Sequence, residues 1–268
     1  MRPVIYYRSP PMLKDELEVA SKYFNCVSSR MYLKAGDLCI PRYSAWPFIK
    51  ELEHDVNYLG AKVINSLQQH SYIADLKNYV SDLGTLTPKT WFQLSSVPKD
   101  GGPFVLKGET NSKKESWLEL MYAKTWDEAS SIYSKLCTDG IIGNQEIYIR
   151  EYVPLANLGW AIGGLPLTKE FRFFICDKQI VSGGFYWDAF ADDIIFQGHK
   201  IPSVDEAPIA FLQKVIDIVD DKARFYTIDV AQTEAGEWIV IELNDGMFAG
   251  LCGNDPNIFY ERLRKIVS

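Results

Sequence analysis

The hydrophobic pattern of the first 85 residues predicts a small lobe in which strands and helices alternate. Residues 4–7 and 37–40 form short apolar runs, whereas residues 15–24 and 74–80 have helical spacing. Short apolar runs bounded by turn residues are typical of strands, and their alternation with helices is typical of an α/β layer. We therefore expect a small α/β lobe over residues 1–85.

The middle of the chain, residues 86–155, has the pattern of a second lobe. Thr87 and Pro88 are typical of a helix start, so we expect an element to begin there. Later elements are a strand over 104–106 that ends in Lys107 and Gly108, a polar loop, a helix from a capping box at Thr125 and Glu128 to about Cys137, and an alternating strand over 146–153.

The last third, residues 156–268, is richest in predicted strands. A turn at Asp177 and Lys178 joins two of them, and a turn over 234–237 joins two more. The expected elements are strands over 169–175, 179–184, 225–230 and 238–244, and helices over 207–220 and 257–267.

Composition narrows the class of protein. The net charge of −7 argues against a strongly cationic nucleic-acid surface, although it does not exclude a local basic groove. The five cysteines are scattered without a Cys-x-x-Cys pair, and the three histidines have no ligand spacing. The chain has neither a run of 18 apolar residues nor a secretory h-region. We expect a reduced, cytoplasmic protein without a membrane span.

The last predicted hairpin carries a candidate metal site. Glu242 and Asn244 are two residues apart in a strand, so their side chains point to the same face. If Asp229 of the neighbouring strand lies on that face, three oxygen-bearing side chains converge, which suits Mg²⁺. A solvated face opposite the core is the simpler interpretation of the bare motif.

Four other residues are candidates for binding phosphate or a nucleotide. Lys107 ends an apolar strand before a glycine, where a cation can reach phosphate. Glu151 ends the strand over 146–153. Glu170 and Arg172 share one face of their strand, either as an exposed ion pair or with the arginine fork gripping an anion. Each has an ordinary surface explanation when it is considered alone.

The order of these pieces resembles the ATP-grasp superfamily over roughly residues 86–268, and Val240-Ile241-Glu242-Leu243-Asn244 is the most telling string. The size is similar to that of small stand-alone ATP-grasp proteins of bacteria and phages. The resemblance implies an α+β fold with two α+β lobes gripping ATP, at 86–155 and 156–268, preceded by the small α/β lobe at 1–85.

The resemblance also implies roles for individual residues. Lys107 and Arg172 would be catalytic, with Lys107 contacting the α- and β-phosphates and Arg172 approaching the γ-phosphate or the phosphorylated intermediate. Asp229, Glu242 and Asn244 would hold magnesium. The nucleotide-binding residues would be Lys89, Lys107, Lys113, Glu151, Tyr152, Val153 and Glu170, with the backbone at Tyr152 and Val153 facing the base. The loop after Lys107 has one glycine where the family has several, and the first 85 residues match no family motif.

The function implied is a Mg-ATP-dependent carboxylate–amine (or carboxylate–nucleophile) ligase that forms an acylphosphate and releases ADP. One alternative is a nucleotidyl transferase or an RNA- or DNA-end ligase that releases pyrophosphate. A second is a non-catalytic nucleotide-binding module. The expected partner is a small molecule or a peptide, and the oligomeric state stays open.

Four aromatic residues are candidates for the acceptor side of the cleft: Tyr43, Trp46, Tyr186 and Trp187. Core or hairpin packing explains them equally well. Asp245, directly after Asn244, is either a further carboxylate at the metals or a solvated turn residue.

Overall fold

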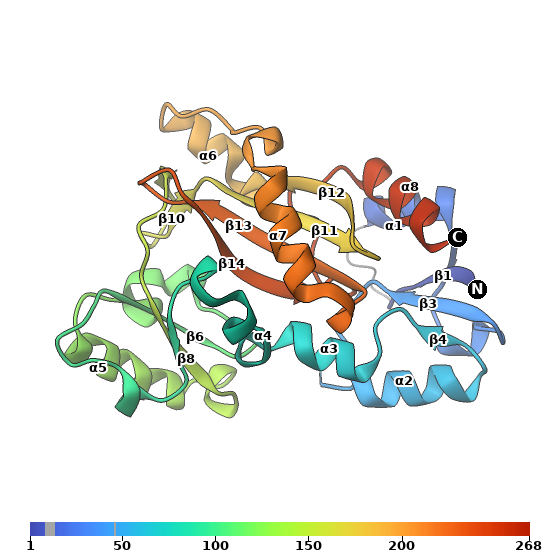
Figure 1. Ribbon diagram of the computed structural model, residues 1–268, viewed down its shortest axis with the longest axis horizontal. Coiled ribbons are helices and arrows are strands. Elements are labelled where there is room, and N and C mark those ends of the chain that lie inside the picture. Colours follow the sequence, from blue (N-terminus) through green and yellow to red (C-terminus); the bar gives the residue numbers. More distant parts are fainter. Residues whose placement is uncertain (9–13, 46) are drawn as a thin grey trace.

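The computed structural model describes residues 1–8, 14–45 and 47–268. Three four-stranded sheets organise these residues, each within one of the three segments expected from the sequence. Figure 1 shows the three sheets spread along the long axis of the molecule, with the sheet of the last segment between the other two.

The N-terminal sheet is parallel and has the strand order β2-β1-β3-β4. Its elements are β1 (Arg2–Tyr6), α1 (Lys14–Tyr23), β2 (Asn25–Val27), β3 (Asp37–Pro41), α2 (Ile49–Tyr58) and β4 (Lys62–Val63). Residues 3–6 and the whole of β3 are buried, as expected for parallel strands covered on both faces. The expected α/β lobe is confirmed.

The middle sheet is antiparallel, with the order β5-β8-β6-β7. Its elements are β5 (Thr90–Trp91), β6 (Phe104–Gly108), β7 (Tyr122–Ala123), α5 (Trp126–Cys137) and β8 (Ile147–Glu151). The Thr125 side chain caps α5 by accepting a hydrogen bond from the backbone of Glu128, as its sequence predicts. We call this unit the small lobe.

The expectation of a helix start at Thr87 and Pro88 is wrong. The chain instead enters the short strand β5, and the Thr87 hydroxyl donates to the carbonyl of Val240, 2.8 Å away. A hydrogen bond to a residue distant in sequence therefore engages the Thr87 side chain, which would otherwise have capped a helix.

The third sheet is also antiparallel, with the order β12-β11-β13-β14, and we call its unit the large lobe. Its strands are β11 (Glu170–Cys176), β12 (Gln179–Phe185), β13 (Phe225–Gln232) and β14 (Trp238–Asp245), and a two-stranded ribbon of β9 (Asn157–Trp160) and β10 (Pro166–Thr168) precedes them. Asp177 and Lys178 both have positive φ, which is the two-residue hairpin turn that the sequence indicates.

Helices cover both faces of this third sheet. Along β11, Phe171, Phe173 and Ile175 share a core with α7 (Ile209–Val219), whereas Phe174 and Cys176 join the core of the N-terminal lobe and α8 (Pro256–Val267). The remaining helices are α3 (Leu67–Ala74), α4 (Leu76–Leu83) and α6 (Ala191–Phe196). Helices α1 and α8 lie side by side, which brings both chain ends to one side of the molecule (Figure 1).

A buried ion pair joins the N-terminal lobe to the end of β14. The Arg42 guanidinium donates to Glu16 at 2.9 and 3.1 Å and to the carbonyl of Gly246 at 2.6 Å. Tyr260 of α8 donates to the same carboxylate oxygen at 2.6 Å. Arg42 and Glu16 are only 4% and 6% exposed, so each depends on the other for its charge.

We expect Arg42→Leu to lower the free energy of unfolding by about 3 kcal/mol, because it leaves the Glu16 carboxylate buried without a cation. Urea denaturation measures the change. Lys265→Ala is the control, since it breaks the exposed pair of Lys265 with Glu261 on α8 and should have no measurable effect. Equal stabilities of the two variants would contradict the prediction.

Candidate active site

A cavity of about 290 Å³ lies between the small-lobe and large-lobe sheets. The small lobe contributes Lys107 of β6 and Arg150 of β8, and the large lobe contributes Glu170 of β11 and Glu242 of β14. Basic side chains thus meet acidic ones across a gap between lobes, which is a common place for a ligand site.

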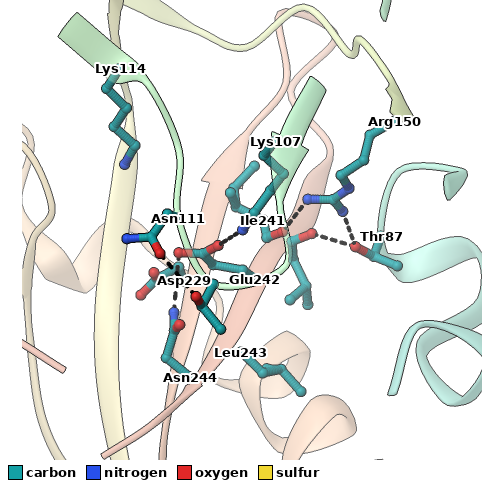
Figure 2. Close-up of polar contacts among 12 residues, drawn as sticks. Thr87, Lys107, Asn111, Lys114, Arg150, Asp229, Ile241, Glu242, Leu243 and Asn244 are labelled. Carbon is teal, nitrogen blue, oxygen red and sulfur yellow. Dashed lines mark hydrogen bonds and ion pairs between the residues drawn. The ribbon is translucent and has the colours of Figure 1, made fainter. Parts of the chain in front are cut away.

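Glu242 and Asn244 project from β14 toward this cavity on the same side, as their spacing predicts. The amide of Asn244 donates to Glu242 at 3.1 Å, and the ammonium of Lys107 lies 2.6 Å from the other oxygen of that carboxylate. Figure 2 shows this group, with Asn111 and Lys114 of the loop after β6 close by. Burial opposes ionisation of Glu242, but the charges of Lys107 and Lys114 hold its pKa below the usual value.

Asp229 is the cross-strand neighbour of Glu242, so the structure brings the three expected oxygen donors together. Asp229 is fully buried, and Arg172 covers it with two hydrogen bonds of 2.8 and 2.7 Å. Burial opposes the charge of Arg172, but the facing Asp229 carboxylate raises the arginine pKa well above its usual value. The two side chains therefore form an ion pair, and neither is among the residues that line the cavity.

This donor set fits a divalent cation that also binds phosphate. The described residues contain no group of three or more His, Cys, Asp or Glu side chains arranged for a metal. Two carboxylates and one amide oxygen match Mg²⁺, which usually takes one or two carboxylates and fills its other positions with phosphate and water. Lys107 and Arg172 neutralise the negative charges of Glu242 and Asp229 here. A bound divalent cation would neutralise the same charges.

The backbone at the end of β8 lies on the opposite wall. Glu151, Tyr152 and Val153 all line the cavity. The amide N–H of Tyr152 donates to the carbonyl of Pro103 at 3.0 Å, so this group is already in use. The sequence leads us to expect that the backbone of Tyr152 and Val153 faces the base. The groups that remain for this contact are the N–H of Val153 and the carbonyl groups of the two residues.

Sequence reasoning missed Arg150. Its guanidinium donates to the carbonyl of Ile241 at 2.6 Å and to the Thr87 hydroxyl at 2.8 Å (Figure 2). It is only 7% exposed, and burial lowers its pKa. The structure buries four successive residues of β8, so the alternation of the sequence does not indicate which face Arg150 occupies.

Two lysines expected at the nucleotide are not among the residues that line the cavity. Lys89 extends over the ring of Trp91, 5.2 Å from its centroid. Lys113 pairs with Asp139 at 2.8 Å. The next residue, Lys114, lines the cavity instead, although its sequence context is that of an ordinary loop lysine. In an irregular loop, neighbouring side chains can point to opposite sides of the chain. No periodicity in the sequence specifies which of the two lysines faces the cavity.

A family of known proteins matches most of the part of the chain that forms this cavity. The family model described as ATP-grasp domain, R2K clade family 3, matches residues 97–263, more than half of the chain. The chain belongs to this ATP-grasp family. Among curated proteins, the sequence search finds no match.

Solved structures agree with the ATP-grasp fold. D-cycloserine synthetase DcsG has a TM-score of 0.61 at 12% identity, and each chain is covered completely. The RimK domain protein ATP-grasp from Sphaerobacter thermophilus DSM 20745 has a TM-score of 0.59 at 12% identity, covering 99% of this chain and all of that one. The ATP-grasp ligase PsnB, complexed with a phosphomimetic variant of its minimal precursor, Mg and ADP, has a TM-score of 0.58 at 9% identity, covering 100% and 99%.

The remaining candidates of this ATP-grasp chain divide between the cavity and the core. Tyr186 and Trp187 line the cavity, whereas Tyr43 packs edge to face on Tyr6 in the N-terminal core. Trp46 lies outside the described residues. Asp245 is neither solvated nor directed at the metal candidates, because it accepts hydrogen bonds from Asn65 at 3.0 Å and the backbone of Met247 at 2.8 Å.

The described part of the chain has no helix that is both long and apolar enough to cross a membrane. Its five cysteines are unpaired, as their spacing predicts.

Glu170 should make the stability of this ATP-grasp protein depend on pH. Burial raises the pKa of this 4%-exposed carboxyl from 4.5 to about 8. The native state therefore binds one more proton than the unfolded chain between these values, so stability is present at pH 5 and lost as the pH rises toward 8. At about 1.4 kcal/mol per pH unit, the loss amounts to about 4 kcal/mol.

Urea denaturation of wild type and Glu170→Gln at several pH values between 5 and 8 measures this contribution. We expect the variant to lose less stability over the range, since it has no proton to release. Glu234→Gln changes an exposed glutamate at the edge of the same cavity and should retain the wild-type slope. Parallel curves for wild type and Glu170→Gln would contradict the prediction.

Proposed function

We propose that the protein is a Mg-ATP-dependent ligase that activates a carboxylate as an acylphosphate and joins it to an amine or another nucleophile, releasing ADP. One observation carries the proposal: Lys107 and the Glu242–Asn244 pair meet in a cavity directly in front of the Arg172–Asp229 pair. Phosphoryl transfer depends mainly on positioning and on neutralising charge, and this arrangement supplies both.

The cavity has room and chemistry for a nucleotide along its length. Val105, Ile239 and Ile241 give an apolar section beside the backbone of Tyr152 and Val153, which suits a purine base. Lys107 and Lys114 lie farther along, where phosphates of the same nucleotide would follow. Lys89 and Lys113 have no part in the proposed site, because their side chains are engaged elsewhere.

Two cationic side chains of the site exchange partners in this proposal. Lys107 leaves Glu242 for a phosphate oxygen, and Arg172 leaves Asp229 for the γ-phosphate or the acylphosphate. Asp229, Glu242 and Asn244 would then hold magnesium, which neutralises charge on the transferring phosphoryl group. Guanidinium and ammonium groups bind carboxylate and phosphate alike, which supports this exchange of partners.

The ligase class has support from the relatives in fold, one of which is named a synthetase and another a ligase complexed with a peptide precursor, Mg and ADP. By this analogy the substrate is a small molecule or a peptide. The fold alone does not decide between them, since one fold hosts many reactions.

Identification of the nucleotide product tests the proposal. We expect the purified protein, given Mg-ATP and separate pools of amino acids, short peptides, other metabolites and RNA ends, to release ADP and phosphate with one carboxylate-containing pool. AMP and pyrophosphate, with an AMP adduct on Lys107 or Lys89 in the mass spectrum, would instead identify nucleotidyl transfer. Tight Mg-ATP binding without product from any pool would identify a binding module.

Glu242→Gln should reduce ADP release by a factor of about 100 or more, because it removes the carboxylate charge proposed to hold the metal. The substitution preserves the shape of the side chain, and circular dichroism should show an unchanged fold. Steady-state ADP release in the responsive pool measures the effect, with Glu234→Gln as the control. Undiminished activity of Glu242→Gln would rule out the metal assignment.

A further inference from the structure

One end of the cavity has a composition that phosphate binding does not explain. Its walls include Thr168, Glu170, Tyr186 and Trp187. The two rings meet edge to face with centroids 5.0 Å apart. Two large aromatic faces beside a buried carboxylate are suited to a cation and not to a phosphate.

An ammonium group of the protein itself already lies against the two rings. The Lys114 nitrogen lies 4.4 Å from the centroid of Tyr186 and 4.9 Å from that of Trp187, and it donates to the Tyr186 hydroxyl at 2.6 Å. This side chain is a stand-in for a primary ammonium from outside the chain. It shows that the rings and the hydroxyl together can hold such a group.

The Glu170 carboxyl beside these rings is poorly satisfied. Within the described residues its side chain accepts one long hydrogen bond, of 3.4 Å from the Thr168 hydroxyl, and makes no ion pair. The charges that act on it come from four elements: Lys114 and Arg172 favour its ionised form, whereas Asp229 and Glu242 oppose it. Burial is the largest influence and raises its pKa to about 8. A buried acid with so little compensation is expected to meet a cation when a ligand arrives.

We propose that this end of the cavity is the acceptor subsite, that it takes a primary amine in its ammonium form, and that Glu170 is the general base that deprotonates it. The inference rests on the ligase function proposed above and specifies its nucleophile. Phosphate is a stronger partner than two ring faces for Lys114, so a bound nucleotide draws that ammonium away. The vacated rings then hold the ammonium of the acceptor next to Glu170.

The geometry of β11 connects this base to the reaction. Glu170 and Arg172 are two residues apart in a strand, so they share a face. Arg172 also lies with its guanidinium carbon 5.0 Å from the centroid of Tyr186. A base at position 170 therefore stands beside the arginine proposed to hold the acylphosphate.

In the proposed step, the ionised Glu170 takes one proton from the bound ammonium and leaves a neutral amine. The nitrogen lone pair attacks the acylphosphate carbonyl carbon and a C–N bond forms. The bond between that carbon and the oxygen that bridges it to phosphorus breaks, and its electron pair stays on the oxygen of the departing phosphate. The second nitrogen proton leaves on phosphate, and Glu170 returns its proton to water.

Three nucleophiles of different basicity test the proposal with the carboxylate pool that supports ADP release. Hydroxylamine is neutral at neutral pH and needs neither the cation subsite nor the base, whereas ethylamine and n-butylamine arrive as ammonium ions. We expect Glu170→Gln to lower alkylamine-supported ADP release by a factor of about 100 or more relative to hydroxamate formation by the same variant. Raising the pH should restore the alkylamine rate of the variant as more free amine becomes available.

Glu234→Gln is the matched control and should retain both rates. An equal loss with hydroxylamine and alkylamines would overturn the proposal, because it would place Glu170 in phosphoryl transfer or in the fold. An unchanged alkylamine rate would also overturn it. If wild type releases no ADP with any pool, the ligase function itself fails, and this inference fails with it.

Binding of the cation alone provides a second measurement. In saturation-transfer NMR, n-butylammonium should receive magnetisation from the protein in the presence of Mg and a non-hydrolysable ATP analogue, and the neutral 1-pentanol should not. We expect Glu170→Gln to remove the signal while nucleotide binding persists. Equal signals from the two probes would show an apolar site and contradict an ammonium subsite.

Discussion

The outer edge of strand β14 is the constraint on which the site depends. No strand pairs with this edge in the described residues, and β14 is the last strand of its sheet. Three side chains take the place of a strand. Thr87 donates to the carbonyl of Val240, Arg150 to that of Ile241, and the Tyr79 hydroxyl bonds both the N–H and the carbonyl of Leu243 at 3.0 and 3.2 Å.

These three side chains come from parts of the chain outside the large lobe. Tyr79 is in α4, Thr87 follows α4, and Arg150 is in β8 of the small lobe. Because Glu242 lies between two of the bonded positions, its direction is set by all three segments at once. Unpaired backbone groups at a buried edge would be costly, so the same bonds that position the site also hold the lobes together.

The sequence predicts the parts of this arrangement that local chemistry controls. The alternation of apolar and polar residues predicts β11, β13 and β14, and the two-residue spacing of Glu242 and Asn244 places both on one face. The capping residue Thr125 predicts the start of α5. What local chemistry does not control escapes prediction. Thr87 has the sequence of a helix cap, but a carbonyl 153 residues away takes its hydroxyl. Arg150 and Lys114 have unremarkable surroundings in sequence, and only tertiary packing brings them to the cavity.

Asp245 connects the site to the N-terminal lobe. Directly after Asn244 the chain leaves the site, and the Asp245 carboxylate meets Asn65 at 3.0 Å and the His70 ring at 2.9 Å. Asn65 in turn donates to the carbonyl of Phe225 and accepts from its N–H, so it joins the end of β13 to the end of β14. The two strands that carry Asp229 and Glu242 are thus fastened at their far ends by the N-terminal lobe. A lobe without any recognisable motif therefore has a definite physical task, because it fastens the ends of the two strands whose pairing sets Asp229 beside Glu242.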